Sequence, residues 1–161
     1  MSSVYVIGSG SREHVIIETL LLNNNIDNVY VYPGNSGILA LDKVSKSLFK
    51  PFTTEFFEFT SNFIDFVIPS TELELVSGIS DALNQRGIRC FGPSAYAARI
   101  EGSKIFSKNF MKDNNIPTSD FEVFNDFEKA KKYLISIGYD KVVIKVSGLA
   151  AGKGVVLPEN I

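Results

Sequence analysis

Short apolar runs alternate with amphipathic segments along the first hundred residues of the chain. The apolar runs, each the length of a buried strand, are Val4–Ile7, Val29–Tyr32, Val44–Leu48, Asp65–Ile68 and Ile88–Phe91. The segments with helical spacing are Arg12–Leu22, Thr54–Asn62 and Glu72–Arg86. Buried strands separated by helices pair in parallel through right-handed crossovers. The pattern therefore predicts an α/β fold with a doubly wound parallel sheet over about residues 1–100.

The order of elements changes after this region. Two helical segments, Ser94–Ile100 and Ser103–Asp113, lead to a boundary at Ile116-Pro117-Thr118. A strand, a helix and two further strands are then expected at Phe121–Phe124, Asp126–Ile137, Lys141–Val146 and Gly154–Leu157. The last two strands are joined by a short loop and must be antiparallel. We therefore expect an N-terminal domain at 1–102, a helical linker at 103–118 and an incomplete α+β subdomain at 119–161, short enough to indicate a fragment of a longer protein.

Composition and charge narrow the class of protein. Hydrophobic residues make up 45% and charged residues 21% of the chain, which excludes disorder. A net charge of −2 gives no basic excess to drive binding to nucleic acid or to an anionic membrane. One cysteine and one histidine exclude a disulfide framework and a Cys/His zinc cage. No targeting leader or membrane-spanning run is visible, so we expect a cytoplasmic protein.

A glycine-rich loop joins the first expected strand to the first expected helix, and it reads Gly8-Ser9-Gly10-Ser11-Arg12-Glu13-His14. Backbone N–H groups at this place in a doubly wound fold can bind an anion. The dinucleotide fingerprint is absent, because Glu13 stands at its third glycine and Tyr32-Pro33 at its acidic position. Arg12 instead suits a single phosphate. A tight turn with solvated charges is the alternative, and His14 alone is more typical of a packed or capping histidine.

A second glycine-rich loop, 147–154, lies between the last two expected strands. It is not a P-loop, since its glycines are one residue too close and Gly154 stands where a metal-binding Ser or Thr belongs. Such a loop between antiparallel strands can fold over a triphosphate, with backbone donors and Lys153 facing it. A flexible hairpin tip is the alternative.

Three charged residues outside these loops are weaker candidates. Lys145 lies in an otherwise apolar strand, where it must meet an anion or extend to water. Glu72 begins a helix just after a strand, where a carboxylate offsets the helix dipole or accepts hydrogen bonds from sugar hydroxyls. Lys104 begins a helix, an unfavourable place for a cation unless a ligand lies close, although many such lysines are merely exposed.

Five segments in order carry a family resemblance that extends over nearly the whole chain. They are GSGSREH (8–14), PGNSG (33–37), FGPSAYAARIEGSKIFSKNFM (91–111), IPT (116–118) and VVIKVSGLAAGKGVV (142–156). Together they resemble the glycinamide ribonucleotide synthetase (phosphoribosylamine–glycine ligase) family of ATP-grasp enzymes. The resemblance implies a Rossmann-like pre-ATP-grasp domain followed by the start of an ATP-grasp domain.

The resemblance also implies a reaction in purine biosynthesis. ATP phosphorylates the carboxylate of glycine with the help of Mg²⁺, and the amine of 5-phosphoribosylamine attacks the acyl phosphate to give glycinamide ribonucleotide. The residues implied on the phosphoribosylamine side are Gly8, Ser9, Gly10, Ser11, Arg12, Glu13, His14, Gly34, Asn35 and Glu72. Those implied to bind the ATP phosphates are Lys104, Lys145, Gly148, Gly152, Lys153 and Gly154.

Two departures from the family pattern matter. Glu72 lies in Ser70-Thr71-Glu72-Leu73-Glu74-Leu75, without the Gly and Pro of the family's Gly-Pro-Glu-x-Pro-Leu. The Mg²⁺ ligands are expected beyond Ile161, so the fragment should hold no catalytic or metal-binding residue and no ligase activity. Fusion to other purine-pathway enzymes in the parent protein is left open. The alternatives are another ATP-grasp carboxylate ligase and a non-catalytic module that binds a nucleotide or phosphosugar.

Overall fold

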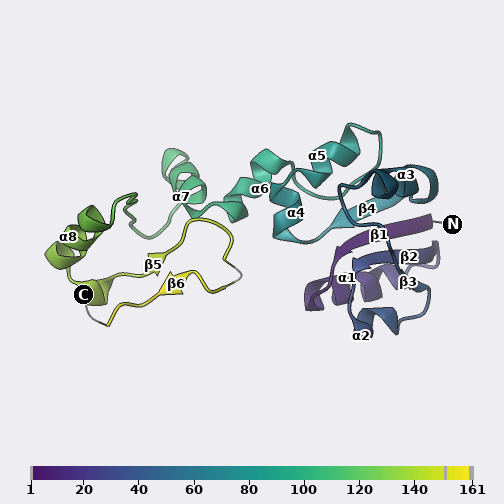
Figure 1. The fold of residues 1–161 in the computed structure, drawn as a ribbon, viewed down its shortest axis with the longest axis horizontal. Helices are drawn as coiled ribbons and strands as arrows, with labels where there is room; N and C mark the ends of the chain where they lie inside the picture. The colour runs from purple at the N-terminus through teal and green to yellow at the C-terminus, as the bar shows by residue number, and fades with distance from the viewer. Residues whose placement is uncertain (1, 151, 160–161) are drawn as a thin grey trace. The chain divides into compact units, whose positions relative to one another are not determined.

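A four-stranded parallel sheet organises the first part of the chain in the computed structural model, which describes residues 2–150 and 152–159 (Figure 1). The strand order is β3-β2-β1-β4. The strands are β1 (Ser2–Gly8), β2 (Ile26–Pro33), β3 (Val44–Lys46) and β4 (Phe66–Pro69). Every neighbouring pair is parallel, and Val6 of the central strand β1 lies opposite Val31 and Ile68. The predicted parallel sheet is confirmed.

Helices cover both faces of this sheet (Figure 1). They are α1 (Ser11–Leu21), α2 (Ser36–Leu39), α3 (Thr54–Phe63), α4 (Glu72–Val76) and α5 (Ile79–Asn84). Side chains of β1 alternate between two cores, because successive residues of a strand point to opposite faces. Val4 and Val6 pack with Ile17 of α1, whereas Tyr5 packs with Phe56 of α3. Burial on both faces confirms the doubly wound architecture.

Two local expectations about this region differ from the structure, and one short helix was missed. The expected helix Glu72–Arg86 is wrong, because Gly78 adopts a φ of +88° and separates α4 from α5. The expected strand Ile88–Phe91 is wrong as well, since only an isolated parallel bridge joins Cys90 to Val67. The four-residue helix α2 was not predicted, because one turn is too short to show a helical period.

The chain divides into two compact units, Met1–Ala98 and Arg99–Ile161, with the helix α6 (Ala95–Gly102) at the division. The second unit contains α7 (Lys104–Asp113), α8 (Phe127–Ile137), the 3₁₀ turn η1 (Tyr139–Lys141), β5 (Ile144–Lys145) and β6 (Val155–Val156). The pair β5–β6 is antiparallel, as predicted. The expected strand Phe121–Phe124 is wrong, because this segment has no regular secondary structure. No helix within the described ranges combines the length and apolar character needed to cross a membrane.

Local contacts hold the second unit together. Asp126 caps α8, with its Oδ1 accepting a hydrogen bond from Lys129 N at 2.8 Å. Lys108 of α7 donates from Nζ to Thr118 Oγ1 at 2.8 Å and to the carbonyl oxygen of Ser119 at 2.9 Å. These bonds fasten the segment that follows α7 onto the helix. The segment at the expected boundary, residues 116–118, is therefore hydrogen-bonded to α7 through Thr118.

Candidate functional site

The first glycine loop lies at the carboxyl end of β1, the edge at which parallel α/β sheets bind ligands. Gly8 ends the strand with a φ of +146°, and Gly10 is the N-cap of α1. Ser9, Gly10 and Ser11 are exposed. The first N–H groups of a helix have no acceptor within the helix, so this loop presents donors and a partial positive charge to solvent.

The end of β2 is tied directly to this loop. The backbone N–H of Gly34 donates to the carbonyl oxygen of Gly8 at 3.1 Å. Asn35 donates from Nδ2 to the carbonyl oxygen of Ser9 at 2.7 Å, and its Oδ1 accepts from Ile38 N at 3.0 Å as the cap of α2. The structure thus brings together the two predicted segments 8–14 and 34–35. Asn35 is placed to hold Ser9 rather than to point away from the loop.

The end of β4 completes the same edge of the sheet. Arg12 donates from Nη2 to Glu72 Oε1 at 2.7 Å and from Nη1 to the carbonyl oxygen of Ser70 at 3.3 Å. The Arg12 side chain is 60% exposed and that of Glu72 is 31% exposed. A permanent cation and a carboxylate therefore lie side by side at the surface, next to the glycine loop. The structure places Glu72 beside Arg12 of the loop, although the Gly and Pro of the family pattern are missing.

Glu13 and His14 occupy different environments. Glu13 is buried, and its two carboxylate oxygens accept hydrogen bonds from Gly10 N at 2.5 Å and Ser70 Oγ at 2.7 Å. His14 is half-buried, with Nε2 at 3.7 Å from Glu18 Oε1. Ser70 was not among the predicted site residues. Its position directly after a strand of the sheet was the available signal.

The second glycine loop is joined to the start of α7. The backbone N–H of Lys104 donates to the carbonyl oxygen of Ser147 at 2.9 Å, and Lys104 Nζ donates to that of Gly148 at 3.3 Å. Ser147 Oγ also accepts from Ile105 N at 3.2 Å. The structure therefore brings Lys104 to the loop, as the resemblance implies. Ser147 makes the connection, although only its glycine and lysine neighbours were predicted as site residues.

The other residues predicted on this loop are placed as follows. Val146 N donates to the carbonyl oxygen of Gly154 at 2.8 Å, and a Cβ at Gly154 would lie 2.6 Å from the Cβ of Ala150. Gly152 has a φ of +77°. Lys145 and Lys153 are exposed, and across 99–150 and 152–159 no hydrogen bond joins either side chain to the loop.

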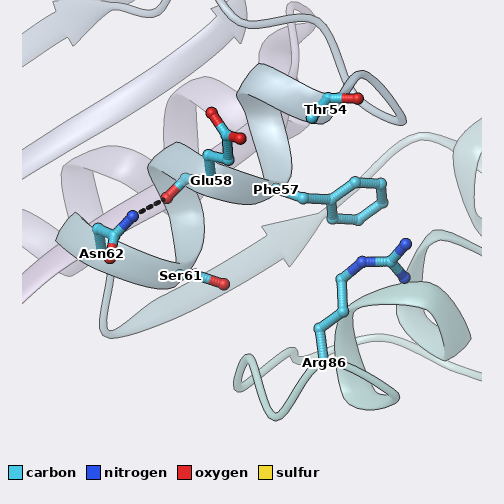
Figure 2. A pocket seen from close by; sticks show the side chains of 6 residues that line it. All are labelled: Thr54, Phe57, Glu58, Ser61, Asn62 and Arg86. Atoms are coloured by element: carbon cyan, nitrogen blue, oxygen red, sulfur yellow. Dashed lines mark hydrogen bonds between the residues drawn. The ribbon is translucent and has the colours of Figure 1, made fainter.

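A shallow hollow of about 310 Å³ lies elsewhere on the first unit, between α3 and the residues after α5 (Figure 2). Its side chains include Glu58 and Phe57. The Cζ atom of Arg86 stacks on the Phe57 ring, 4.1 Å from the ring centroid. None of the predicted site residues lines it. Within the described residues, no group of three or more His, Cys, Asp or Glu side chains could hold a metal ion.

Two models of known protein families match the chain. The model of the phosphoribosylglycinamide synthetase N domain matches residues 2–101, and that of the same enzyme's ATP-grasp (A) domain matches residues 102–161. The chain belongs to the phosphoribosylglycinamide synthetase family. The resemblance seen in its motifs is therefore confirmed.

Two members of this family match nearly the whole chain. A bifunctional purine biosynthetic protein purD from Dictyostelium discoideum is 43% identical over 161 residues, covering 99% of this chain and 20% of that protein. A phosphoribosylamine–glycine ligase from Listeria monocytogenes is 45% identical over 155 residues, covering 95% of this chain and 36% of that ligase. The chain thus spans about a fifth to a third of the length of these relatives.

Solved structures support the fold of this chain. The phosphoribosylamine–glycine ligase of Thermotoga maritima superposes with a TM-score of 0.75 at 30% identity, over 98% of this chain and 36% of that one. An N5-carboxyaminoimidazole ribonucleotide synthetase from Thermotoga maritima gives a TM-score of 0.67 at 22% identity. At that identity the likeness shows a shared fold alone.

Proposed function

We propose that this chain supplies the phosphoribosylamine-binding domain and the first part of the ATP-binding domain of a phosphoribosylamine–glycine ligase. The ligase joins glycine to 5-phosphoribosylamine at the expense of ATP and releases glycinamide ribonucleotide, ADP and phosphate. The observation that carries the proposal is the grouping of Arg12, Asn35 and Glu72 around the glycine loop at one edge of the sheet. The family match supports it.

The phosphate of phosphoribosylamine binds at the first glycine loop in this proposal. The exposed loop precedes an 11-residue helix, whose N-terminal N–H groups favour an anion. Arg12 adds a guanidinium suited to bidentate contact with phosphate. Glu72, held beside Arg12, is placed to accept hydrogen bonds from the ribose hydroxyls. Since the ligand carries the anion and the sugar together, one adjacent cation and carboxylate serve both parts.

The second glycine loop is proposed to contact the phosphates of ATP. Gly148 has open space where a side chain would stand, so the backbone there is accessible to a bulky anion. Lys104 is held at this loop, and its charge offsets that of a phosphate. Magnesium is a proposed cofactor of the whole ligase. The described residues offer no acidic cluster to hold it.

Three finer assignments follow from the family match as proposals. Residues 1–102 form the N-terminal domain, 103–118 a helical linker and 119–161 the start of the ATP-grasp subdomain. The reaction takes place in the cytoplasm, and fusion to other purine-pathway domains is supported by the bifunctional relatives.

Calorimetry of the 161-residue chain with glycinamide ribonucleotide tests the phosphoribosyl side. Arg12→Ala is expected to weaken binding at least ~10-fold, because a charge-assisted hydrogen bond contributes roughly 1.5–3 kcal/mol. Arg86→Ala removes the same charge from an exposed arginine elsewhere in the first unit, and it should leave the affinity unchanged. The nucleoside without its phosphate should bind weakly to all three proteins. Equal affinities for Arg12→Ala and the parent chain would remove the phosphate site from this loop.

Turnover is a separate measurement. We expect the 161-residue chain to bind the ribonucleotide but to form no ADP in the presence of glycine and phosphoribosylamine, since the described residues lack the acidic groups of a complete centre. ADP formation that requires both substrates would contradict this expectation.

A further inference from the structure

Glu13 is the one buried acidic side chain among the described residues, and it lies directly beneath the first glycine loop. It is 4% exposed. Its position, three residues after the N-cap Gly10, lets the side chain turn back and accept the N–H of Gly10 at 2.5 Å. A buried carboxylate whose two oxygens both accept hydrogen bonds from the protein stabilises the local structure and does not face solvent.

The other oxygen of Glu13 reaches a different part of the fold. It accepts a hydrogen bond from Ser70 Oγ at 2.7 Å, and Ser70 is itself 7% exposed. The carbonyl oxygen of Ser70 in turn accepts Nη1 of Arg12 at 3.3 Å. Consecutive residues of α1 therefore contact the same residue after β4, one from the interior and one from the surface. Moving Ser70 would move the anchor of Arg12.

The glycines of the loop are shaped around Glu13. A Cβ at Gly8 would lie 2.4 Å from Glu13 Cγ and 2.6 Å from Cδ, and one at Gly10 would lie 3.0 Å from Oε2. Real Cβ atoms do not approach a neighbour as closely as the first two distances. The absence of side chains at the first two glycines thus makes room for Glu13 below the loop, besides leaving the backbone open above it.

We infer that Glu13 is a positioning residue, which fastens the first glycine loop to the junction of β4 and α4 and so fixes where Arg12 meets the ligand phosphate. The inference rests on the proposed function for its ligand, but its structural part does not. Because Glu13 takes the N–H of Gly10, that donor faces inward. The N–H groups further along the loop and the Arg12 guanidinium are left to define the anion site.

Paired substitutions separate positioning from a direct charge effect on the ligand. Glu13→Gln keeps the length of the side chain, and its amide can accept from Gly10 while donating to Ser70, since a hydroxyl can accept as well as donate. Glu13→Asp keeps the charge but is shorter by about 1.5 Å, the length of one bond. It cannot reach both partners from the same backbone. Glu58→Gln, at an exposed position of α3, is the control for loss of a negative charge.

The expected result is that glutamine substitutes for Glu13 better than aspartate does. Glu13→Gln and Glu58→Gln should bind glycinamide ribonucleotide within ~3-fold of the parent chain, whereas Glu13→Asp should lose ~10-fold or more, because small displacements of binding groups are costly. Hydrogen exchange of the Gly10 amide, followed by NMR without ligand, should stay slow in Glu13→Gln and become fast in Glu13→Asp. The reverse order, or no effect of either change, would overturn the inference.

Ser70→Ala gives a second route if a Glu13 variant does not fold. It deletes only the hydroxyl that donates to Glu13, and a weakening of ~3-fold is expected with the Gly10 amide still protected, since that bond remains. Unchanged affinity in Ser70→Ala would overturn the role of the connection to β4. If the parent chain fails to bind the ribonucleotide at all, the proposed function fails. The Gly10 exchange rates then still decide whether Glu13 holds the loop.

Discussion

The two glycine loops of the chain are held in place by different means. The first lies at the edge of a parallel sheet, with a buried carboxylate beneath it and two neighbouring strand ends bonded to it. The second joins two-residue strands whose side chains are exposed, and it is held mainly by backbone bonds to Ser147 and Gly154. Both present glycines and cations, yet only the first is part of a core. Substitutions in the first loop should therefore change stability, whereas a side chain at Gly148 of the second loop meets open space and should change stability little.

Gly8→Ala is expected to have the largest effect on stability. The new Cβ would overlap Glu13 Cγ at 2.4 Å, and the φ of +146° is strained for any residue but glycine. Together these should lower the free energy of unfolding of the first unit by ~3 kcal/mol. Urea denaturation measures the loss.

Gly148→Ala is the matched control in the second loop, where a Cβ meets nothing within 4 Å. Its effect should stay within ~0.5 kcal/mol, as for most surface changes. The double variant Gly8→Ala/Glu13→Ala tests the cause, because removing Glu13 should relieve the overlap but not the backbone strain. Strictly additive losses, or equal losses at Gly8 and Gly148, would erase the contrast between the loops.

The parts of the fold that follow from side-chain periodicity could be predicted, and the parts that depend on partners could not. The apolar run Val4–Ile7 predicted a buried central strand correctly, because burial on both faces leaves no polar positions in the strand. The helix expected at 72–86 has apolar residues at helical spacing throughout, but in the structure Gly78 interrupts the helix. A glycine within a helix costs only about 1 kcal/mol, so the sequence alone does not show whether the helix continues. Phe121–Phe124 has strand-forming residues without a strand to pair with.

The candidate site shows the same division. The glycine loop and Arg12 were predictable, since their position after the first strand determines where they lie. The bond from Asn35 to Ser9 depends on strand order, and the sequence does not state which strands are neighbours. Glu13 was grouped with the residues that line the site, yet its spacing from Gly10 is that of a capping acid. That spacing was the signal for an inward-facing role.

The response to alkaline pH should also distinguish the first unit, whose core contains Tyr5. This side chain is fully buried and donates from its hydroxyl to the carbonyl oxygen of Phe49 at 2.5 Å. Burial raises the pKa of Tyr5 to about 12, from 10.0. The unfolded chain therefore releases this proton first as the pH rises. The stabilisation from neutral Tyr5 is complete below pH 10 and is lost between pH 10 and 12, by at most about 3 kcal/mol.

Tyr5→Phe identifies that contribution. At pH 7 it should lower stability by ~1 kcal/mol through the lost hydrogen bond. Above pH 10 the variant should lose less stability per pH unit than the parent chain, so that the two curves approach each other. Urea denaturation of the first unit at several pH values gives both curves. Parallel curves up to pH 12 would show that Tyr5 ionises equally in the folded and unfolded chain.

The smallest effect is expected at Lys104, at the first turn of α7, where its charge opposes the helix dipole. The hydrogen bond from Lys104 Nζ to the carbonyl oxygen of Gly148 is exposed and 3.3 Å long. It therefore offsets little of the unfavourable interaction between the lysine charge and the helix dipole. Lys104→Ala should therefore stabilise α7 by ~0.3 kcal/mol, whereas Lys112→Ala in the last turn should destabilise it by a similar amount. Amide exchange in α7 at low salt measures both, and added salt should shrink them. A residue that lowers stability where it stands fits a role in ligand binding. If Lys104→Ala destabilises α7, the bond to Gly148 outweighs the dipole, and the second loop is held more like the first.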